Sequence, residues 1–275
     1  MPVVSRARLR QQVGLTKMRD TYVGTVTASY GAVGSVTIID GAVANLAFSG
    51  EGLYVRTWLK VNGMELRVAS FNAGSGAYVT LQTAATVVPS GAPYERHEKL
   101  SPTEKDRAID GLISHIWTRQ EVPINVVDGR LDFSIGTGFH VFGAYQFANP
   151  AGSGTRDPRV VPIAAQIVTT ATGRELRLQA GSLLGSGQQL ILDAQVRATL
   201  GAADAATVNI PDEDWVLNGI AARCYQTLIA DSPSQEGGKY ADLARAYAQE
   251  FRRLSSRFID SGTYDWRNAF GAYVA

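Results

Sequence analysis

Near its end the chain places apolar side chains at a helical period. In residues 239–258, KYADLARAYAQEFRRLSSRF, apolar and aromatic residues recur at steps of three and four, which puts them on one stripe of an α-helix. The stripe consists of Tyr240, Leu243, Tyr247, Phe251, Leu254 and Phe258. So regular a stripe predicts a helix that is buried along one face against other helices.

The other face of this helix is basic towards its end. Its basic residues, with Glu250 as their counter-charge, are Arg245, Arg252, Arg253 and Arg257. Basic residues in the last turns of a helix interact favourably with the helix dipole, which explains them without any partner. The alternative interpretation is a docking face for an acidic partner, and it makes these four arginines candidate partner-binding residues.

The N-terminal segment predicts another helix over residues 5–19, with Ser5 as its N-cap. Its basic residues are Arg6, Arg8, Arg10, Lys17 and Arg19. They indicate either a solvated basic arm or an arm that reaches a neighbouring subunit or nucleic acid.

Residues 101–120 begin with a complete capping box, in which Ser101 is the N-cap, Pro102 is the first helical residue and Glu104 is the third. The apolar stripe that follows is formed by Ile109, Leu112, Ile113, Ile116 and Trp117. The segment therefore predicts a helix with one buried face.

Residues 210–231 predict a further helix, which opens with Pro211 and an acidic first turn. The single cysteine, Cys224, lies on its apolar face and is expected to be a small core residue. The turn at 232–238 is short, so this helix and the helix of 239–259 are expected to form an antiparallel pair.

Between these helices the pattern changes to the period of β-strands. In residues 23–98, short alternating runs surround Asn62-Gly63, the strongest short hairpin signal, and predict a small antiparallel sheet or barrel of about five strands. The alternation after the turn is expected to give one face to Met64, Leu66, Val68 and Ser70.

A second β unit is predicted for residues 121–205, where strands of regular spacing alternate with turn clusters, as in a β-sandwich. Asp128-Gly129 indicates a hairpin in this unit. Pro162 indicates an edge strand or a bulge, because proline cannot donate a hydrogen bond within a sheet.

The predicted fold class is therefore α+β, a discontinuous helical core with two inserted antiparallel β units. The core combines residues 1–22, 99–120 and 206–260, the inserts are 23–98 and 121–205, and residues 261–275 form an aromatic C-terminal tail. The tail shows neither a helical nor a strand period. Its four aromatic residues are Tyr264, Trp266, Phe270 and Tyr273. These rings either pack on their own subunit or insert into a groove of a neighbour, so they join the candidate partner-binding residues.

Composition limits the classes of function. Of the 275 residues, 45% are hydrophobic and 19% are charged, which suits a globular protein with a substantial core. The net charge of +1 argues against a strongly basic nucleic-acid binder. One cysteine excludes an intramolecular disulfide and a cysteine-based metal site. The sequence has no signal peptide and no run of about 18 apolar residues, so we expect a protein made in the cytosol without membrane association.

Common catalytic motifs are absent from the sequence, including the nucleophile elbow, the phosphate-binding loop and the zinc motif HExxH. The carboxylate pairs Asp212/Asp214 and Asp128/Asp132 are explained by helix capping and turn formation. We therefore expect no enzyme activity, no metal and no cofactor, although the second β unit could still hold the facing carboxylates of a glycosidase.

Three features of the chain resemble the head-to-tail connector or adaptor proteins of tailed bacteriophages. The first is a basic helix, SRARLRQQVG, followed by GTVT and by strands that contain TIID and LRVASF. The second is YERHEKLSPTEKDRAIDGLIS (94–114), in which a β unit closes and leads into a capped helix. The third is KYADLARAYAQEFRRL, which is similar to the last core helix of such adaptors. The resemblance covers residues 1–120 and 206–260.

The resemblance implies a structural virion protein at the head–tail junction, made in the host cytoplasm. Adaptors of this family form a homo-oligomeric ring, usually a dodecamer, beneath the portal protein. The opposite face of the ring receives the next neck or tail protein, and DNA passes through the lumen without sequence-specific recognition. The family has no catalytic residues to transfer to this chain, and the second β unit is an addition to it.

Two alternatives remain open at this point. One is another virion role, such as tail completion, decoration or fibre attachment. The other is a glycan-binding or glycan-hydrolysing protein that uses the second β unit. Ring formation, or assembly with a portal protein, distinguishes a connector from a lectin or hydrolase, which would show sugar affinity or turnover.

Overall fold

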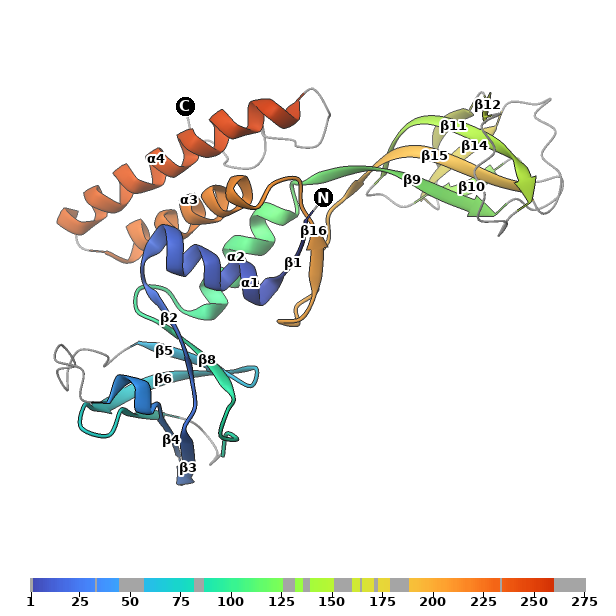
Figure 1. Cartoon of the computed structure of the whole chain (residues 1–275). Helices are drawn as coiled ribbons and strands as arrows, with labels where there is room; N and C mark the ends of the chain where they lie inside the picture. Colours follow the sequence, from blue (N-terminus) through green and yellow to red (C-terminus); the bar gives the residue numbers. More distant parts are fainter. Residues whose placement is uncertain are drawn as a thin grey trace. The chain divides into compact units, whose positions relative to one another are not determined.

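The computed structural model describes residues 2–32, 34–44, 57–81, 87–125, 132–135, 139–150, 160–163, 165–170, 173–178, 188–232 and 234–259. Unit 1 comprises Met1–Ile113 and Leu200–Ser255, and unit 2 comprises Ser114–Thr199 and Ser256–Ala275. Figure 1 labels helices and strands of both units. Their helices and antiparallel sheets confirm the predicted α+β class.

Unit 1 contains the helices and the larger sheet. Its elements are β1 (Val3–Ser5), α1 (Arg6–Gln12), the π-helix η1 (Val13–Met18), β2 (Thr21–Thr25), β3 (Ala28–Ala32), β4 (Ser35–Ile39), the 3-10 helix η2 (Gly41–Val43), β5 (Trp58–Val61), β6 (Met64–Asn72), β7 (Ala77–Leu81), β8 (Pro93–His97), α2 (Pro102–Ile113), β16 (Thr207–Asn209), α3 (Glu213–Asp231) and α4 (Ser234–Ile259), whose last turn continues beyond the unit. Strands β1 and β16 pair with each other and bring the N-terminal segment beside the segment that precedes α3.

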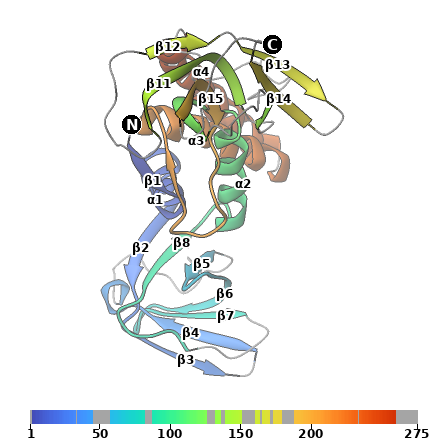
Figure 2. The ribbon, with the colours of Figure 1, turned by 90° about the vertical axis from the view of Figure 1, so that its right-hand side faces the viewer.

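Seven strands of unit 1 form one antiparallel sheet in the order β2-β8-β5-β6-β7-β4-β3. The two end strands, β2 and β3, follow each other along the chain, as Figure 2 shows. Between them, Val26 N donates to Ala92 O (2.9 Å) and Thr27 N donates to Ile39 O (2.7 Å), so the chain passes from one end of the sheet to the other without a break. The sheet therefore closes into a small barrel, as the sequence allowed, with two strands more than predicted.

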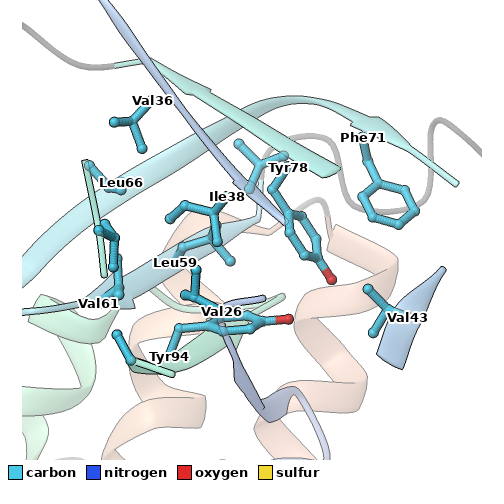
Figure 3. Packing of buried hydrophobic residues seen from close by; sticks show 13 residues of the cluster. Val26, Val36, Ile38, Val43, Leu59, Val61, Leu66, Phe71, Tyr78 and Tyr94 are labelled. Carbon is cyan, nitrogen blue, oxygen red and sulfur yellow. The ribbon is translucent and has the colours of Figure 1, made fainter. Parts of the chain in front are cut away.

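The barrel is filled by buried apolar side chains, most of them from β4, β5, β6, β7 and β8 (Figure 3). The largest of them belong to Leu59, Leu66, Phe71, Tyr78 and Tyr94. The predicted hairpin at Asn62-Gly63 is confirmed, because β5 and β6 pair from Val61 and Met64 outwards. Both turn residues have positive φ, 48° for Asn62 and 74° for Gly63, as a type I′ turn requires.

Strand β6 follows the predicted alternation only in its first half. Leu66 and Val68 are buried as expected, but Ser70 is exposed and Phe71 occupies the buried position. The register of β6 against β7 shifts between Val68 and Ser70. This β-bulge adds one residue and moves the following side chains to the other face, so the prediction for Ser70 is wrong.

The predicted starts of the first two helices are confirmed by their caps. Ser5 Oγ accepts a hydrogen bond from Arg8 N (3.2 Å) at the start of α1. In α2, Ser101 N donates to Glu104 Oε2 (2.8 Å) and Glu104 N donates to Ser101 Oγ (3.2 Å), which is a reciprocal capping box. Helix α3 starts at Glu213 instead of Pro211, because Asp212 is its N-cap and accepts a hydrogen bond from Trp215 N (2.7 Å).

The predicted end of α2 is wrong. The helix stops at Ile113 instead of continuing to residue 120, and Trp117 already begins strand β9. Ile116 is buried as expected, although it lies beyond the helix. The apolar spacing could not show where the helix ends. Over three or four residues, a helix and a strand can bury the same apolar position, here Ile116, so the pattern does not distinguish them.

Helices α3 and α4 form the predicted antiparallel pair (Figure 1). Trp215, at the start of α3, stacks on Phe251, near the end of α4, with ring centroids 5.1 Å apart, whereas Tyr225 stacks on Tyr247 at 5.7 Å. Gly219 makes room for this packing, because a Cβ there would lie 2.7 Å from the Phe251 ring. Cys224 is fully buried, which confirms it as a core residue.

Helix α4 starts at Ser234, within the segment that the sequence predicted to be a turn. Of its aromatic stripe, Phe251 and Leu254 are buried, while Tyr240, Leu243 and Tyr247 are half-buried. The side chain of Phe258 lies outside the described part of the chain. Two small buried residues that the sequence analysis overlooked, Ala244 and Ala248, complete the face that packs on α3.

Unit 2 contains two antiparallel sheets. Its strands are β9 (Trp117–Asn125), β10 (Asp132–Ile135), β11 (Phe139–Pro150), β12 (Val160–Ile163), β13 (Ala165–Thr170), β14 (Gly173–Leu178) and β15 (Gln188–Arg197). They form a sheet β12-β11-β15-β9 and a sheet β10-β14-β13.

Two predictions for unit 2 concern particular residues. Pro162 lies in β12 at the edge of its sheet, which confirms the edge position. Asp128-Gly129 lies outside the described residues. The described strands on either side, β9 and β10, pair with β15 and β14, and the hairpin at Asp128-Gly129 stays a prediction.

Replacing Phe251 with alanine tests the importance of the α3–α4 contact. Phe251 is 0% exposed, so Phe251→Ala should lower the free energy of unfolding by about 3–5 kcal/mol, through lost burial and the cavity that remains. Urea unfolding followed by the helical circular-dichroism signal measures this loss. Arg245→Ala, on the exposed face of the same helix, is the control and should change stability little; equal stability of both variants would contradict the packing.

Candidate functional site

An ion-pair network joins the helices of unit 1 to the barrel. Its centre is Arg10 of α1, whose side chain is 0% exposed. The guanidinium donates two hydrogen bonds to Glu95 of β8 (2.8 and 2.9 Å) and further bonds to Asp106 of α2 (2.9 Å) and to Asp204 (3.0 Å). Lys60 of β5 contacts the same two aspartates, at 3.3 and 3.0 Å. One side chain thus connects α1, α2, the barrel and the segment that precedes β16.

A second buried group continues this network. Lys105 of α2 donates to Asp20 Oδ1 (2.7 Å) and Thr21 Oγ1 (2.8 Å), and its Nζ lies 3.0 Å from His97 Nδ1. His97 Nε2 in turn lies 2.9 Å from Glu95 Oε2, the carboxylate that binds Arg10. The side chains of Lys105 and Asp20 are 0% exposed, so the two charges neutralise each other inside the unit.

The surroundings of Glu95 and His97 change the pKa values of both groups. Burial alone raises the pKa of Glu95, but the hydrogen bonds and charges of His97 and Arg10 more than offset it and lower this pKa to about 2. Burial lowers the pKa of His97, and the charge of Lys105 adds to this effect. At neutral pH the network therefore holds an ionised Glu95 beside a neutral His97.

The chain of contacts Thr21–His97–Glu95 has the connectivity of nucleophile, base and carboxylate found in hydrolases. Thr21 Oγ1, however, is surrounded by the protein. It lies 3.0 Å from His97 Nδ1 and 2.8 Å from Lys105 Nζ, and a Cβ placed on Gly14 would come within 1.9 Å of it. A substrate carbonyl cannot approach this oxygen, so we interpret the network as a structural element.

The N-terminal basic segment was expected to be either a solvated arm or an arm that reaches a partner. For most of its charged residues both interpretations are wrong. Arg6 is buried and pairs with Asp110 of α2. Arg8 forms a two-bond pair with Glu213 (2.8 Å each), and Lys17 pairs with Asp214 (2.6 Å). These charges bind carboxylates of their own unit because α1 packs on α2 and beside the start of α3. The carboxylates lie far away along the chain, so periodicity could not identify them.

The candidate arginines of α4 lie on its exposed face. Arg245 pairs with Asp242 (3.2 Å), a counter-charge that the sequence analysis overlooked, and Arg253 forms two hydrogen bonds with Glu250 (2.8 and 2.6 Å). Arg252 and Arg257 are also exposed. Exposed pairs between neighbouring turns contribute little to stability, so they leave the stripe accessible to a partner. We name Arg245, Arg252, Arg253 and Arg257 the α4 basic stripe.

The other four candidate residues are the aromatic side chains of the tail. They all lie outside the described residues, and their role as assembly anchors stays a prediction. They are Tyr264, Trp266, Phe270 and Tyr273.

A groove between α2 and α3 is a further candidate that the sequence analysis missed. It has a volume of about 450 Å³, and we name it the α2–α3 groove. Its walls are formed by Glu104, Arg107 and Ala108 of α2 and by Arg223, Gln226 and Thr227 of α3. No sequence signal identifies it, because its two arginines come from helices that are separated along the chain by residues 114–199 of unit 2.

Comparisons of the chain with family models, with curated proteins and with solved structures found no match. Within the described part of the chain, no group of three or more His, Cys, Asp or Glu side chains is placed to hold a metal ion. None of the described helices has the length and apolar character needed to cross a membrane.

The buried network predicts that acid destabilises unit 1. The unfolded chain protonates His97 near its ordinary pKa of 6.5, whereas the folded pKa is lower, so the stability that depends on neutral His97 is lost as the pH falls below 6.5. For Glu95, stability is present above the ordinary pKa of 4.5 and is lost as the pH falls towards 2. Each proton contributes at most about 1.4 kcal/mol per pH unit.

Urea unfolding at pH 7.5, 6.5, 5.5 and 4.5, followed by circular dichroism, measures this dependence. His97→Gln should flatten the slope between pH 6.5 and 5.5, since the titrating group is gone. His140→Gln, in β11 of unit 2, is the matched control and should keep the wild-type slope. An unchanged slope in His97→Gln would contradict the assignment.

Proposed function

We propose that this protein is a structural component of a tailed-phage virion, a head-to-tail adaptor whose subunits form a ring beneath the portal protein. The ring would join the capsid to the next neck or tail protein, and DNA would pass through its lumen without sequence-specific contacts. The resemblance of the helical segments to adaptors, and their order along the chain, support this proposal.

The observation that carries the proposal is the two-sided character of α4. One face is buried at Ala244, Ala248, Phe251 and Leu254 and packs on α3, while the opposite face exposes the α4 basic stripe. Because these charges add little to the stability of the subunit, they are available to an acidic partner surface. In the adaptor proposal that partner is the portal or a neighbouring subunit.

Two finer points belong to the same proposal. In this proposal, the helices that come together from separate stretches of unit 1 form the adaptor core. The sheets β12-β11-β15-β9 and β10-β14-β13 would be the two layers of a β-sandwich inserted into that core. A sandwich in this position would decorate the neck or contact the capsid or fibres.

Charge reversal on α4 tests the proposed docking. The double variant Arg252→Glu/Arg253→Glu should leave the subunit folded but weaken assembly by at least about tenfold, because attraction at the interface becomes repulsion. The measurement is size-exclusion chromatography with light scattering, for the protein alone and with the portal protein of the same phage. Arg19→Glu/Arg67→Glu changes the net charge equally at exposed sites outside α4 and is the control.

The outcomes of this experiment separate the interpretations. If both double variants assemble like the wild type, the α4 basic stripe does not bind the partner and the helix dipole explains its charges. If the wild type forms neither a ring nor a portal complex, the adaptor proposal fails.

Removal of the tail tests the second group of candidate residues. Deleting residues 262–275 should leave the circular-dichroism spectrum and melting temperature nearly unchanged but abolish ring formation or portal binding, if the aromatic rings insert into a neighbour. The control is a full-length chain with only Tyr264→Ala, which removes one of the four rings. Unfolding of the truncated chain would show that the tail belongs to its own core, and full assembly would show that it is not an anchor.

A further inference from the structure

The α2–α3 groove combines a ligand-sized volume with basic walls. Its volume of about 450 Å³ lies within the range of about 300–1,000 Å³ that is typical of binding pockets. Helices α2 and α3 lie side by side and form its two walls (Figure 2). The groove is therefore a feature of the rigid helical part of unit 1, where side chains keep defined positions.

The wall formed by α3 is the polar part of an otherwise buried helix. Most of α3 from Trp215 to Leu228 is buried, whereas Arg223, Gln226 and Thr227 are half-buried and line the groove. The guanidinium of Arg223 and the carboxamide of Gln226 carry hydrogen-bond donors, whereas the Thr227 hydroxyl donates to Arg223 O (3.3 Å). This wall suits a ligand that presents acceptors, such as carboxylate oxygens.

The wall formed by α2 strengthens the preference for anions. Arg107 is exposed and lines the groove opposite Arg223. Among the described lining residues, Glu104 alone is acidic, and it already accepts a hydrogen bond from Ser101 N (2.8 Å) as part of the capping box. Its negative charge thus compensates the start of α2, and the lining as a whole carries one positive charge in excess.

Small residues keep the space next to the arginines open. Ala108 lines the groove, and Gly111 lies beside it on α2. A Cβ on Gly111 would lie 2.7 Å from a terminal nitrogen of Arg223, so the guanidinium rests against the helix backbone where a side chain would otherwise stand. This position holds Arg223 deep in the groove, while Arg107 lies at its exposed edge.

We propose that the α2–α3 groove binds an acidic peptide segment of a partner protein. Carboxylates of the segment bind Arg107 and Arg223, which match carboxylates with paired donors, and Gln226 donates to the peptide backbone. The volume of about 450 Å³ and the two arginines on different walls favour a segment with several acceptors over a single ion. The proposal does not depend on the adaptor role, and it concerns a surface separate from the α4 basic stripe.

The experiment uses the full chain and a fluorescein-labelled hexapeptide of glutamate as the probe. Fluorescence anisotropy measures its dissociation constant, with a hexapeptide of glutamine as the neutral control. Arg107→Glu should raise the dissociation constant at least about tenfold, and circular dichroism checks that this exposed substitution leaves the fold intact. Arg67→Glu, an exposed arginine of the barrel, makes the same charge change and should have an effect of less than about threefold.

A second measurement locates the peptide without relying on a charge change. The same glutamate peptide with a benzophenone group is photo-cross-linked to the wild type, and mass spectrometry identifies the attached residues. Attachment to α2 or α3 supports the proposal, whereas attachment only to α4 assigns the binding to the α4 basic stripe and overturns it. Gln226→Ala, an uncharged change, should weaken binding about threefold if the groove is occupied.

Other outcomes also overturn the proposal. Equal binding of the glutamine peptide would show that charge is not recognised. Equal losses in Arg107→Glu and Arg67→Glu would show a general electrostatic attraction. Complete displacement of the glutamate peptide by inorganic phosphate at low millimolar concentration would assign the groove to a small anion instead of a peptide.

Discussion

The arrangement of unit 1 depends on the buried guanidinium of Arg10. A cation without access to water costs several kcal/mol unless carboxylates surround it, so Glu95, Asp106 and Asp204 must all be present at the same point. They belong to the barrel, to α2 and to the returning segment before α3. Misplacement of any of these parts would leave a charge unpaired, which gives the network a role in selecting one arrangement of parts that are distant in the chain.

The features that the sequence could predict are those whose cause lies within a few residues. The capping box of Ser101 and Glu104, the cap at Ser5 and the turn at Asn62-Gly63 each need only their immediate neighbours, and all three are confirmed. The bulge that exposes Ser70 depends on pairing with another strand. A period read along one strand contains no information about its partner.

The same distinction applies to the candidate sites. Arg252 and Arg253 could be placed on an exposed face because the helical period of α4 alone determines the faces. Arg10 also lies in a helix that is rich in basic residues, yet tertiary contacts bury it completely. The α2–α3 groove has no sequence signal because its walls meet only when the chain returns after unit 2. Charge along a sequence therefore indicates which groups need partners, but not whether the partners are internal.

Strands β9 and β15 begin and end the excursion of the chain through unit 2. Trp117 pairs with Arg197, and Ala198 N donates to Ile116 O (2.8 Å), so the first and last residues of the excursion are neighbours within their own sheet. In a flexible loop, each doubling of length would cost about 0.6 kcal/mol of closure entropy. Here the pairing of β9 with β15 brings the two ends of residues 114–199 together. The closure entropy is therefore offset within unit 2 and does not reduce the stability of the helices of unit 1. Evolution can consequently lengthen, shorten or exchange residues 114–199 with little effect on the stability of the unit that carries them.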